Sequence, residues 1–149
     1  MVLGVALGVI GAALAFGLSA CGCGVAMGMI GRVGAALMAE DPRKFGQSLV
    51  LQAIGSTSGI YGFLIGFLIF TKALTVTDTA SGMFLLAAGI PMGLAGLVAS
   101  IGQGRVLAAG VILIGKKSSE LAKALIFAAM VETMQIFGLL FSFLMYNSI

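Results

Sequence analysis

The sequence predicts an all-α membrane protein, a duplicated transmembrane helical hairpin with four spans. Apolar residues make up 60% of the 149 positions and charged residues only 9%, and the mean hydropathy is +1.20. Charged clusters divide the chain into four apolar stretches, each longer than the roughly 20 helical residues that cross a hydrocarbon core about 30 Å thick. Inside lipid the backbone must satisfy its own hydrogen bonds, so helices are expected to form these spans. The composition excludes an ordinary soluble domain.

The four spans are expected near residues 2–38, 45–71, 81–115 and 121–146. The first and third are longer than a bilayer requires, so their ends at Arg32 and Arg105 are expected to protrude or to reach the headgroup region. The first span lacks a positively charged start and stays apolar beyond the length of a signal peptide. It is therefore interpreted as a retained span.

The distribution of basic residues predicts the orientation of the chain in the cell membrane. Seven of the eight flank the first and third turns: Arg32, Arg43, Lys44, Arg105, Lys116, Lys117 and Lys123. Lys72 is left for the middle connection. By the positive-inside rule, the turns at 39–44 and 115–120 face the cytoplasm and both termini lie outside. No basic stripe with interleaved aromatic residues occurs, so nucleic acid is not an expected partner.

An internal repeat relates the two halves of the chain. A shift of 76 residues places 48–70 on 124–146 without a gap and with eight identities in 23 positions. We therefore expect a first transmembrane hairpin at 1–72 and a second at 81–149, both entering the membrane from the same side.

Glycine and phenylalanine separate the two helices of each hairpin. Spans one and three hold 17 of the 23 glycines, including the small-xxx-small pairs Gly4/Gly8, Gly24/Gly28 and Gly89/Gly93. Such faces let helix backbones approach closely. Spans two and four hold most of the phenylalanines. We expect an inner layer of glycine-rich helices and a bulky outer layer facing lipid, either repeated around an axis or arranged as a simple four-helix bundle.

Cys21 and Cys23 are two positions apart on a predicted helix and should point to nearly opposite sides. A shared metal ion or a mutual disulfide is geometrically poor. They are interpreted as small packing residues.

Glu132 is the one carboxylate within a predicted span. An acidic residue at mid-membrane costs roughly 2.5 to 3.5 kcal/mol on insertion scales and indicates a functional site. Glu132 lies fourteen residues after Ser118, in the third turn, and Gln103 lies fifteen residues before it. The two should therefore sit at the same depth on adjacent antiparallel helices, with Gln103 facing Glu132.

Span two brings further oxygen donors to this depth. Ile54, Thr57, Ser58 and Tyr61 have the spacing i, i+3, i+4, i+7, which places them on one helix face. Thr133 follows the glutamate, and Gly55 could loosen a backbone carbonyl. A carboxylate, an amide oxygen and hydroxyls suit a small hard cation. The alternative is that Thr57, Ser58 and Gln103 only hydrogen-bond neighbouring helices.

The repeat predicts one such site per four helices. The position equivalent to Glu132 in the first hairpin is Ser56, and the one equivalent to Gln103 is Met27. The first hairpin has therefore lost its acid.

Four segments, EDPRKFGQSLVLQ, GIYGFLIGFLIF, GQGRVLAAG and IFAAMVET, resemble the c/K proteolipid that forms the rotor ring of bacterial V-type rotary ATPases. The resemblance covers nearly all of the chain. It implies a double-hairpin protomer in a closed homo-oligomeric rotor ring with the glycine-rich helices inside. It further implies that Glu132 binds the transported ion, that Gln103 and Thr57 are ligands in sodium-binding members, that Tyr61 hydrogen-bonds Glu132, and that Ile54 contributes a backbone carbonyl.

The chain departs from the family pattern at one ligand. Sodium-binding members read Pro-Gly-Thr-Gln-Gly on span two, whereas this chain reads Gly55-Ser56-Thr57-Ser58-Gly59. Ser58 thus replaces a second glutamine and could reach an ion through water. Na⁺ is the expected transported ion and H⁺ the alternative, with Thr133 as a further oxygen donor and no organic cofactor.

The resemblance also implies the partners of the chain. These are a stator membrane subunit with an arginine, a central-stalk subunit on the cytoplasmic side and membrane lipids, while ATP hydrolysis or synthesis takes place elsewhere. A different class, the proton-coupled small multidrug antiporter, has a similar size and one membrane glutamate. Such antiporters usually carry the acid in span one with tryptophan nearby, and this chain has no Trp.

Overall fold

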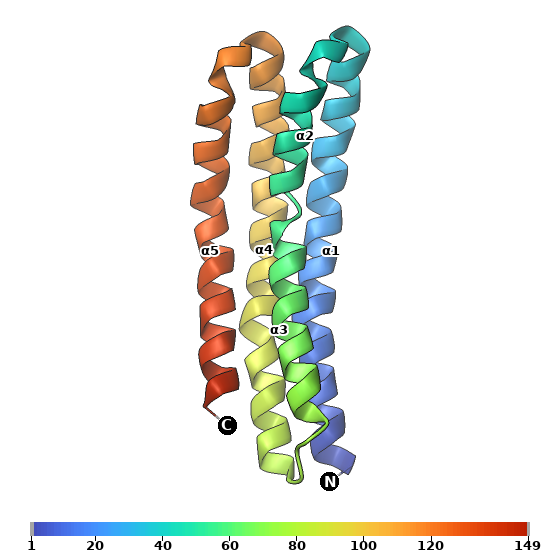
Figure 1. Ribbon diagram of the computed structural model, residues 1–149, viewed down its shortest axis with the longest axis vertical. Helices are drawn as coiled ribbons and strands as arrows, with labels where there is room; N and C mark the ends of the chain where they lie inside the picture. Colours follow the sequence, from blue (N-terminus) through green and yellow to red (C-terminus); the bar gives the residue numbers. More distant parts are fainter. Residues whose placement is uncertain (1, 149) are drawn as a thin grey trace.

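A computed structural model describes residues 2–148 and contains helices and no strand in that range (Figure 1). In chain order the elements are α1 (Val2–Glu40), a 3-10 turn (Pro42–Lys44), α2 (Phe45–Ile54), α3 (Thr57–Ala73), α4 (Thr79–Lys116), a second 3-10 turn (Ser118–Glu120) and α5 (Leu121–Asn147). Four segments are long and apolar enough to cross a membrane: Val2–Glu40, Pro42–Ala73, Thr79–Lys116 and Ser118–Asn147. The prediction of an all-α protein with four spans is confirmed.

The four spans run side by side along the long axis of the molecule. Both 3-10 turns lie at one end, whereas the start of α1, the α3–α4 connection and the end of α5 lie at the other (Figure 1). Seven of the eight basic residues thus lie in the half of the molecule nearer the two turns, and Lys72 lies near the opposite end.

Aspartate side chains cap two elements, the first 3-10 turn and α4. Asp41 accepts a hydrogen bond from the Arg43 backbone N–H at 3.1 Å, and Pro42 occupies the first position of the turn, where a missing N–H does no harm. The side-chain hydrogen bond from Arg43, 2.9 Å from Nε to the carboxylate, holds the pKa of Asp41 below its usual value. Asp78 caps α4 through the Ser81 N–H at 2.8 Å, and this hydrogen bond lowers the pKa of Asp78.

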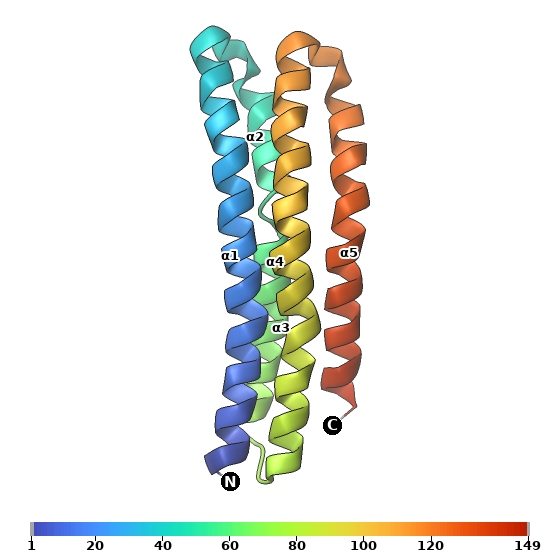
Figure 2. The same cartoon turned by 180° about the vertical axis from the view of Figure 1, so that it is seen from behind.

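Helices α1 and α4 form the closest pair, because glycine lets their backbones touch (Figure 2). A Cβ added to Gly22 would lie 2.6 Å from the Gly96 carbonyl oxygen, and one added to Gly104 would lie 2.5 Å from the Ala26 Cα. A Cβ on Gly89 would overlap the Gly11 carbonyl group. The predicted tight pairing of the glycine-rich helices is confirmed.

Not every predicted glycine pair takes part in this contact. A Cβ on Gly24 or Gly28 would meet nothing within 4 Å, because both residues point away from α4. The bulky residues of α3 and α5 also point outward: Phe63 is 58% exposed and Phe137 is 60% exposed. These faces are free to contact lipid or another protomer.

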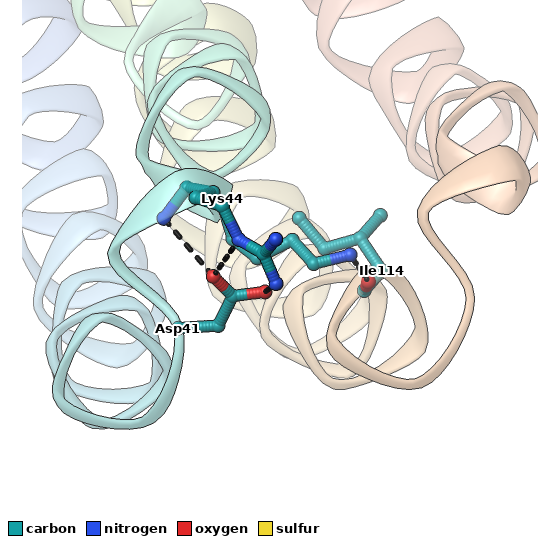
Figure 3. A network of polar contacts seen from close by, with 4 residues as sticks. Asp41, Lys44 and Ile114 are labelled. Carbon is teal, nitrogen blue, oxygen red and sulfur yellow. Dashed lines mark hydrogen bonds and ion pairs between the residues drawn. The ribbon is translucent and has the colours of Figure 1, made fainter.

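Hydrogen bonds join the first turn and the start of α2 to the end of α4 and the second turn. Lys44 Nζ donates to the Ile114 carbonyl at 3.2 Å, next to the Asp41 cap (Figure 3). Gln47 Nε2 donates to the Ser118 carbonyl at 3.0 Å. The first hairpin is therefore fastened to the second at this end, by its turn and by the start of α2.

Candidate ion-binding site

Glu132 lies on α5, half-buried, where that helix meets α3. The Tyr61 hydroxyl donates a hydrogen bond to its Oε1 at 2.9 Å. Tyr61 itself packs against a buried apolar cluster that includes Ala15, Ile65 and Met92. The packed ring fixes the position of the hydroxyl, and the hydroxyl fixes the carboxylate.

The second span is interrupted close to this carboxylate. Helix α2 ends at Ile54 and α3 begins at Thr57, so Gly55 and Ser56 form a short turn, with dihedral angles still in the right-handed region, within one membrane span (Figure 1). Gly55 is buried against α1, where a Cβ would lie 2.5 Å from the Ile30 Cδ1. No larger residue fits without displacing Ile30, and a glycine weakens the helix at this point.

Side chains contact the carbonyls at the interruption, where the Gly59 N–H bonds the Ser56 carbonyl at 3.2 Å. Thr57 Oγ1 donates to the Ile54 carbonyl at 3.0 Å. The Cys23 thiol of α1 lies 3.7 Å from the Gly55 and Ser56 carbonyl oxygens. A break in the α-helical hydrogen-bond pattern at membrane depth is tolerated where such partners exist. The interruption therefore places a carbonyl and a hydroxyl, from Ile54 and Thr57, beside each other.

Two buried amides lie beside Glu132 on its other side. Gln103 of α4 is 0% exposed, and its Nε2 donates to the Ala128 carbonyl of α5 at 3.4 Å. Gln135 of α5, also 0% exposed, donates from Nε2 to Gln103 Oε1 at 2.9 Å. Gln103 thus spans the α5 turns before and after Glu132. The predicted shared depth is observed, although these two bonds run to Ala128 and Gln135 and not to the carboxylate.

Two buried oxygens near this group have no hydrogen-bond partner within residues 2–148. They are Ser58 Oγ and Gln135 Oε1. An unsatisfied buried polar atom costs about 1 to 3 kcal/mol, so such atoms call for a specific explanation, for example a ligand.

The structure places Thr133 apart from the other predicted donors. Its side chain is exposed, and its hydroxyl donates to the Met130 carbonyl of its own helix at 2.7 Å. Successive residues of a helix are about 100° apart around its axis, since a turn takes about 3.6 residues. The residue after Glu132 therefore points elsewhere, and the structure does not bring Thr133 to the other donors.

Sequence reasoning missed Gln135 and the role of Cys23. Gln135 lies three residues after Glu132, on the same side of the helix, and a polar residue in an apolar span is a detectable signal. The two cysteines do point to opposite sides, with Cys21 exposed and Cys23 buried. The contact of Cys23 with the interruption depends on how α1 is rotated against α3, which spacing does not reveal.

Comparisons with known proteins agree with this architecture. The family of the ATP synthase C-subunit matches the chain twice, over residues 10–69 and 86–145. Both ends of the second match lie 76 residues after those of the first (86 minus 10, 145 minus 69).

Two relatives resemble nearly the whole chain. V-type sodium ATPase subunit K of Enterococcus hirae is 42% identical over 142 residues, which are 95% of this chain and 91% of that protein. A-type ATP synthase subunit K of Methanocaldococcus jannaschii is 44% identical over 139 residues, which are 93% of this chain and 61% of that protein.

Proposed function

The chain belongs to the ATP synthase C-subunit family, as a c/K rotor proteolipid of a V-type rotary ATPase, and from this premise we propose that it binds and carries Na⁺ at Glu132. It is a non-catalytic subunit, so ATP is hydrolysed or made by other subunits. The family membership removes the small multidrug antiporter from consideration.

The hydrogen bond from Tyr61 to Glu132 is the observation that carries this proposal. It ties the carboxylate to α3 one helical turn after Thr57, and so next to the interrupted backbone. The proposed ligands are the Glu132 carboxylate, the Gln103 amide oxygen, the Thr57 hydroxyl and the Ile54 carbonyl. Ser58 lies on the same helix face as Tyr61, buried and without a partner among the described residues.

The oxygen donors favour Na⁺ over H⁺ as the transported ion. A proton site needs a carboxyl that stays neutral when buried, with few competing ligands, whereas a sodium site needs oxygens that keep the carboxylate ionised. A carbonyl, a hydroxyl and an amide at the depth of the carboxylate meet the second requirement. The E. hirae relative is described as part of a sodium ATPase, which points the same way.

In the proposed cycle Glu132 takes up an ion from one aqueous half-channel of a stator subunit. Its charge then stays compensated while the site faces lipid, which removes most of the cost of burying it. Near the stator arginine the ion leaves through a second half-channel. A membrane potential contributes about 2.3 kcal/mol per charge per 100 mV, so several sites in a ring exchange energy with ATP chemistry elsewhere.

We also propose the arrangement of the protomer in its complex. The hairpins 1–72 and 81–149 form one protomer of a closed homo-oligomeric ring. Each protomer has one ion site, because Ser56 of the first hairpin stands where the second hairpin has Glu132. The two turns face the cytoplasm and the central stalk, and both termini lie outside. Lipids fill the centre of the ring.

The test is protection of Glu132 from a carboxyl-modifying carbodiimide in the intact complex. At alkaline pH, Na⁺ should slow the modification in a saturable way, and K⁺ at the same ionic strength should not. Glu132→Gln should abolish both the modification and ATP-driven ion flux. Modification that is insensitive to Na⁺ but slows as protons are removed would replace Na⁺ by H⁺. Normal ATP-driven flux in Glu132→Gln would end the proposal altogether.

A further inference from the structure

Gln135 carries an unused hydrogen-bond acceptor in the interior of the protein. Its side chain is 0% exposed, and its Nε2 is taken up by Gln103 Oε1 at 2.9 Å. Its own Oε1 has no partner within residues 2–148. Burying an amide without hydrogen bonds is unfavourable. A glutamine at this position is therefore hard to explain by packing alone, since a leucine of similar size would avoid the penalty.

The position of Gln135 connects it to the proposed ion site. It follows Glu132 by three residues on α5, and side chains at this spacing are neighbours on one side of a helix. Its partner Gln103 also reaches Ala128, one turn before Glu132. The two amides are therefore beside the carboxylate, and the free oxygen belongs to the same group of atoms.

Gln103 can serve Gln135 and a cation at the same time. An amide oxygen has two lone pairs, and the Gln135 N–H uses one of them. The second remains available to a cation. The Gln103–Gln135 hydrogen bond is thus compatible with both amide oxygens facing one ion.

The other unpartnered oxygen near the site, Ser58 Oγ, belongs to α3. Ser58 precedes Tyr61 by three residues, and Tyr61 bonds Glu132, so Ser58 is on the face of α3 that meets α5. By the family resemblance, Ser58 stands where sodium-binding members carry a second glutamine, and its side chain is shorter. The interior has thus lost an amide oxygen from α3, while α5 offers one.

We infer that Gln135 Oε1 is a ligand of the transported cation and replaces the amide oxygen that Ser58 cannot supply. The ligand set then contains two glutamines, one from α4 and one from α5. The inference rests on the proposed function, because it requires Na⁺ to bind at Glu132. It goes beyond that function by adding a ligand from the helix that carries the carboxylate.

The experiment measures the Na⁺ concentration that half-protects Glu132 from carbodiimide modification, at one alkaline pH, in the intact complex. Gln135→Leu should raise this concentration by about tenfold or more, as loss of one good ligand predicts. Gln52→Leu is the control, because the Gln52 side-chain amide also donates across helices, at 3.1 Å to the Met27 carbonyl, but lies outside the site. Its half-protecting Na⁺ concentration should stay within about twofold of that of the wild-type protein.

A double variant separates a ligand from a residue that only positions Gln103. Adding S58Q to Gln135→Leu restores an amide oxygen from α3 and should recover most of the Na⁺ affinity. If S58Q gives no recovery, Gln135 acts only by holding Gln103 and the ligand role is overturned. An unchanged Na⁺ requirement in Gln135→Leu overturns the inference directly.

Two further outcomes remain decisive. If Gln135→Leu fails to assemble, Gln135→Asn keeps an amide but withdraws its oxygen by one methylene, and it should show the same loss of Na⁺ affinity. An Asn variant with normal affinity overturns the inference. Failure of the proposed function is recognised separately, because Na⁺ would then not protect Glu132 in the wild-type protein either. The ligand assignment would fall with it.

Discussion

At the scale of single residues, the position of Glu132 is determined by one phenol. The Tyr61 ring is packed in the apolar cluster, and its hydroxyl reaches Oε1 at 2.9 Å. Hydrogen bonds to charged groups contribute about 1.5 to 3 kcal/mol, more than those between neutral groups. Tyr61 therefore helps to keep the carboxylate in one orientation toward α3, ready for an ion.

Replacing Tyr61 by Phe removes this hydrogen bond and keeps the ring. We expect Glu132 to react faster with carbodiimide and the half-protecting Na⁺ concentration to rise by roughly tenfold, equivalent to about 1.4 kcal/mol. Tyr146→Phe is the control, since Tyr146 stacks on Phe143 far from the carboxylate. If Glu132 reacted equally fast with carbodiimide in Tyr61→Phe and in the wild-type protein, this role would be contradicted.

At the scale of elements, the interruption between α2 and α3 is supported from α1. The Cys23 thiol lies 3.7 Å from the carbonyl oxygens of Gly55 and Ser56. Thiols are weak donors, and the Gly59 N–H also bonds the Ser56 carbonyl, yet water is scarce at membrane depth. A small polarizable side chain is well suited to this crowded position.

We expect Cys23→Ala to loosen the interruption without unfolding the protein. Amide hydrogen exchange of the segment 54–58, followed by mass spectrometry in mild detergent, should become several-fold faster, because an opening there loses a stabilising contact. Cys23→Ser, which keeps a donor, should restore slower exchange. Cys21→Ala is the matched control, since Cys21 is exposed. An equal effect of the two alanine variants would refute a specific contact.

The contact between α1 and α4 makes a second prediction for the elements. Gly89→Ala places a Cβ against the Gly11 backbone, and such overpacking costs about 1 to 3 kcal/mol. The midpoint of thermal dissociation of the complex should fall. Gly46→Ala is the control, because a Cβ there meets nothing within 4 Å and alanine favours the helix by about 1 kcal/mol. A stable Gly89→Ala protein would show that the helices separate easily.

At the scale of the whole molecule, charge and shape agree. The turn end carries the ion pair between Arg43 and Asp41, at 2.9 Å, and the pair between Lys123 and Glu120, at 2.5 Å. The span connection at the other end holds Asp78 and the nearby Lys72. Seven of the eight Lys and Arg residues lie nearer the turn end, and this excess is the physical basis for the proposal that this end is cytoplasmic.

Single cysteines at the two ends test that placement. Ser119→Cys lies in the second turn and Thr77→Cys in the α3–α4 connection, and both positions are exposed. In inside-out vesicles a membrane-impermeant maleimide should label Ser119→Cys and spare Thr77→Cys, with the reverse in intact cells. The opposite pattern would invert the orientation.

The sequence predicts the spans and the turns well, because hydropathy and turn residues act locally. The depth of Gln103 relative to Glu132 is also predictable. Both antiparallel helices rise about 1.5 Å per residue from the short turn that joins them, so equal distances in sequence give equal depths. Rotation of one helix against another is set by packing instead. For this reason Gly24 and Gly28 have the same spacing as Gly89 and Gly93 yet point away from α4.

The direction in which a helix residue points also explains which site residues could be predicted from the sequence. Thr133 is adjacent to Glu132 in sequence but points outward, whereas Gln135 is three residues away and points inward. Sequence adjacency is a poor guide on a helix, because neighbours along its axis are three or four residues apart.

The bonds from Lys44 to Ile114 and from Gln47 to Ser118 have a mechanical consequence. A lateral force on either turn acts on both hairpins, so the hairpins resist separation and the protomer tilts as one rigid body. In the proposed ring, torque applied at that end is then passed along α4 and α5 to the depth where the carboxylate lies.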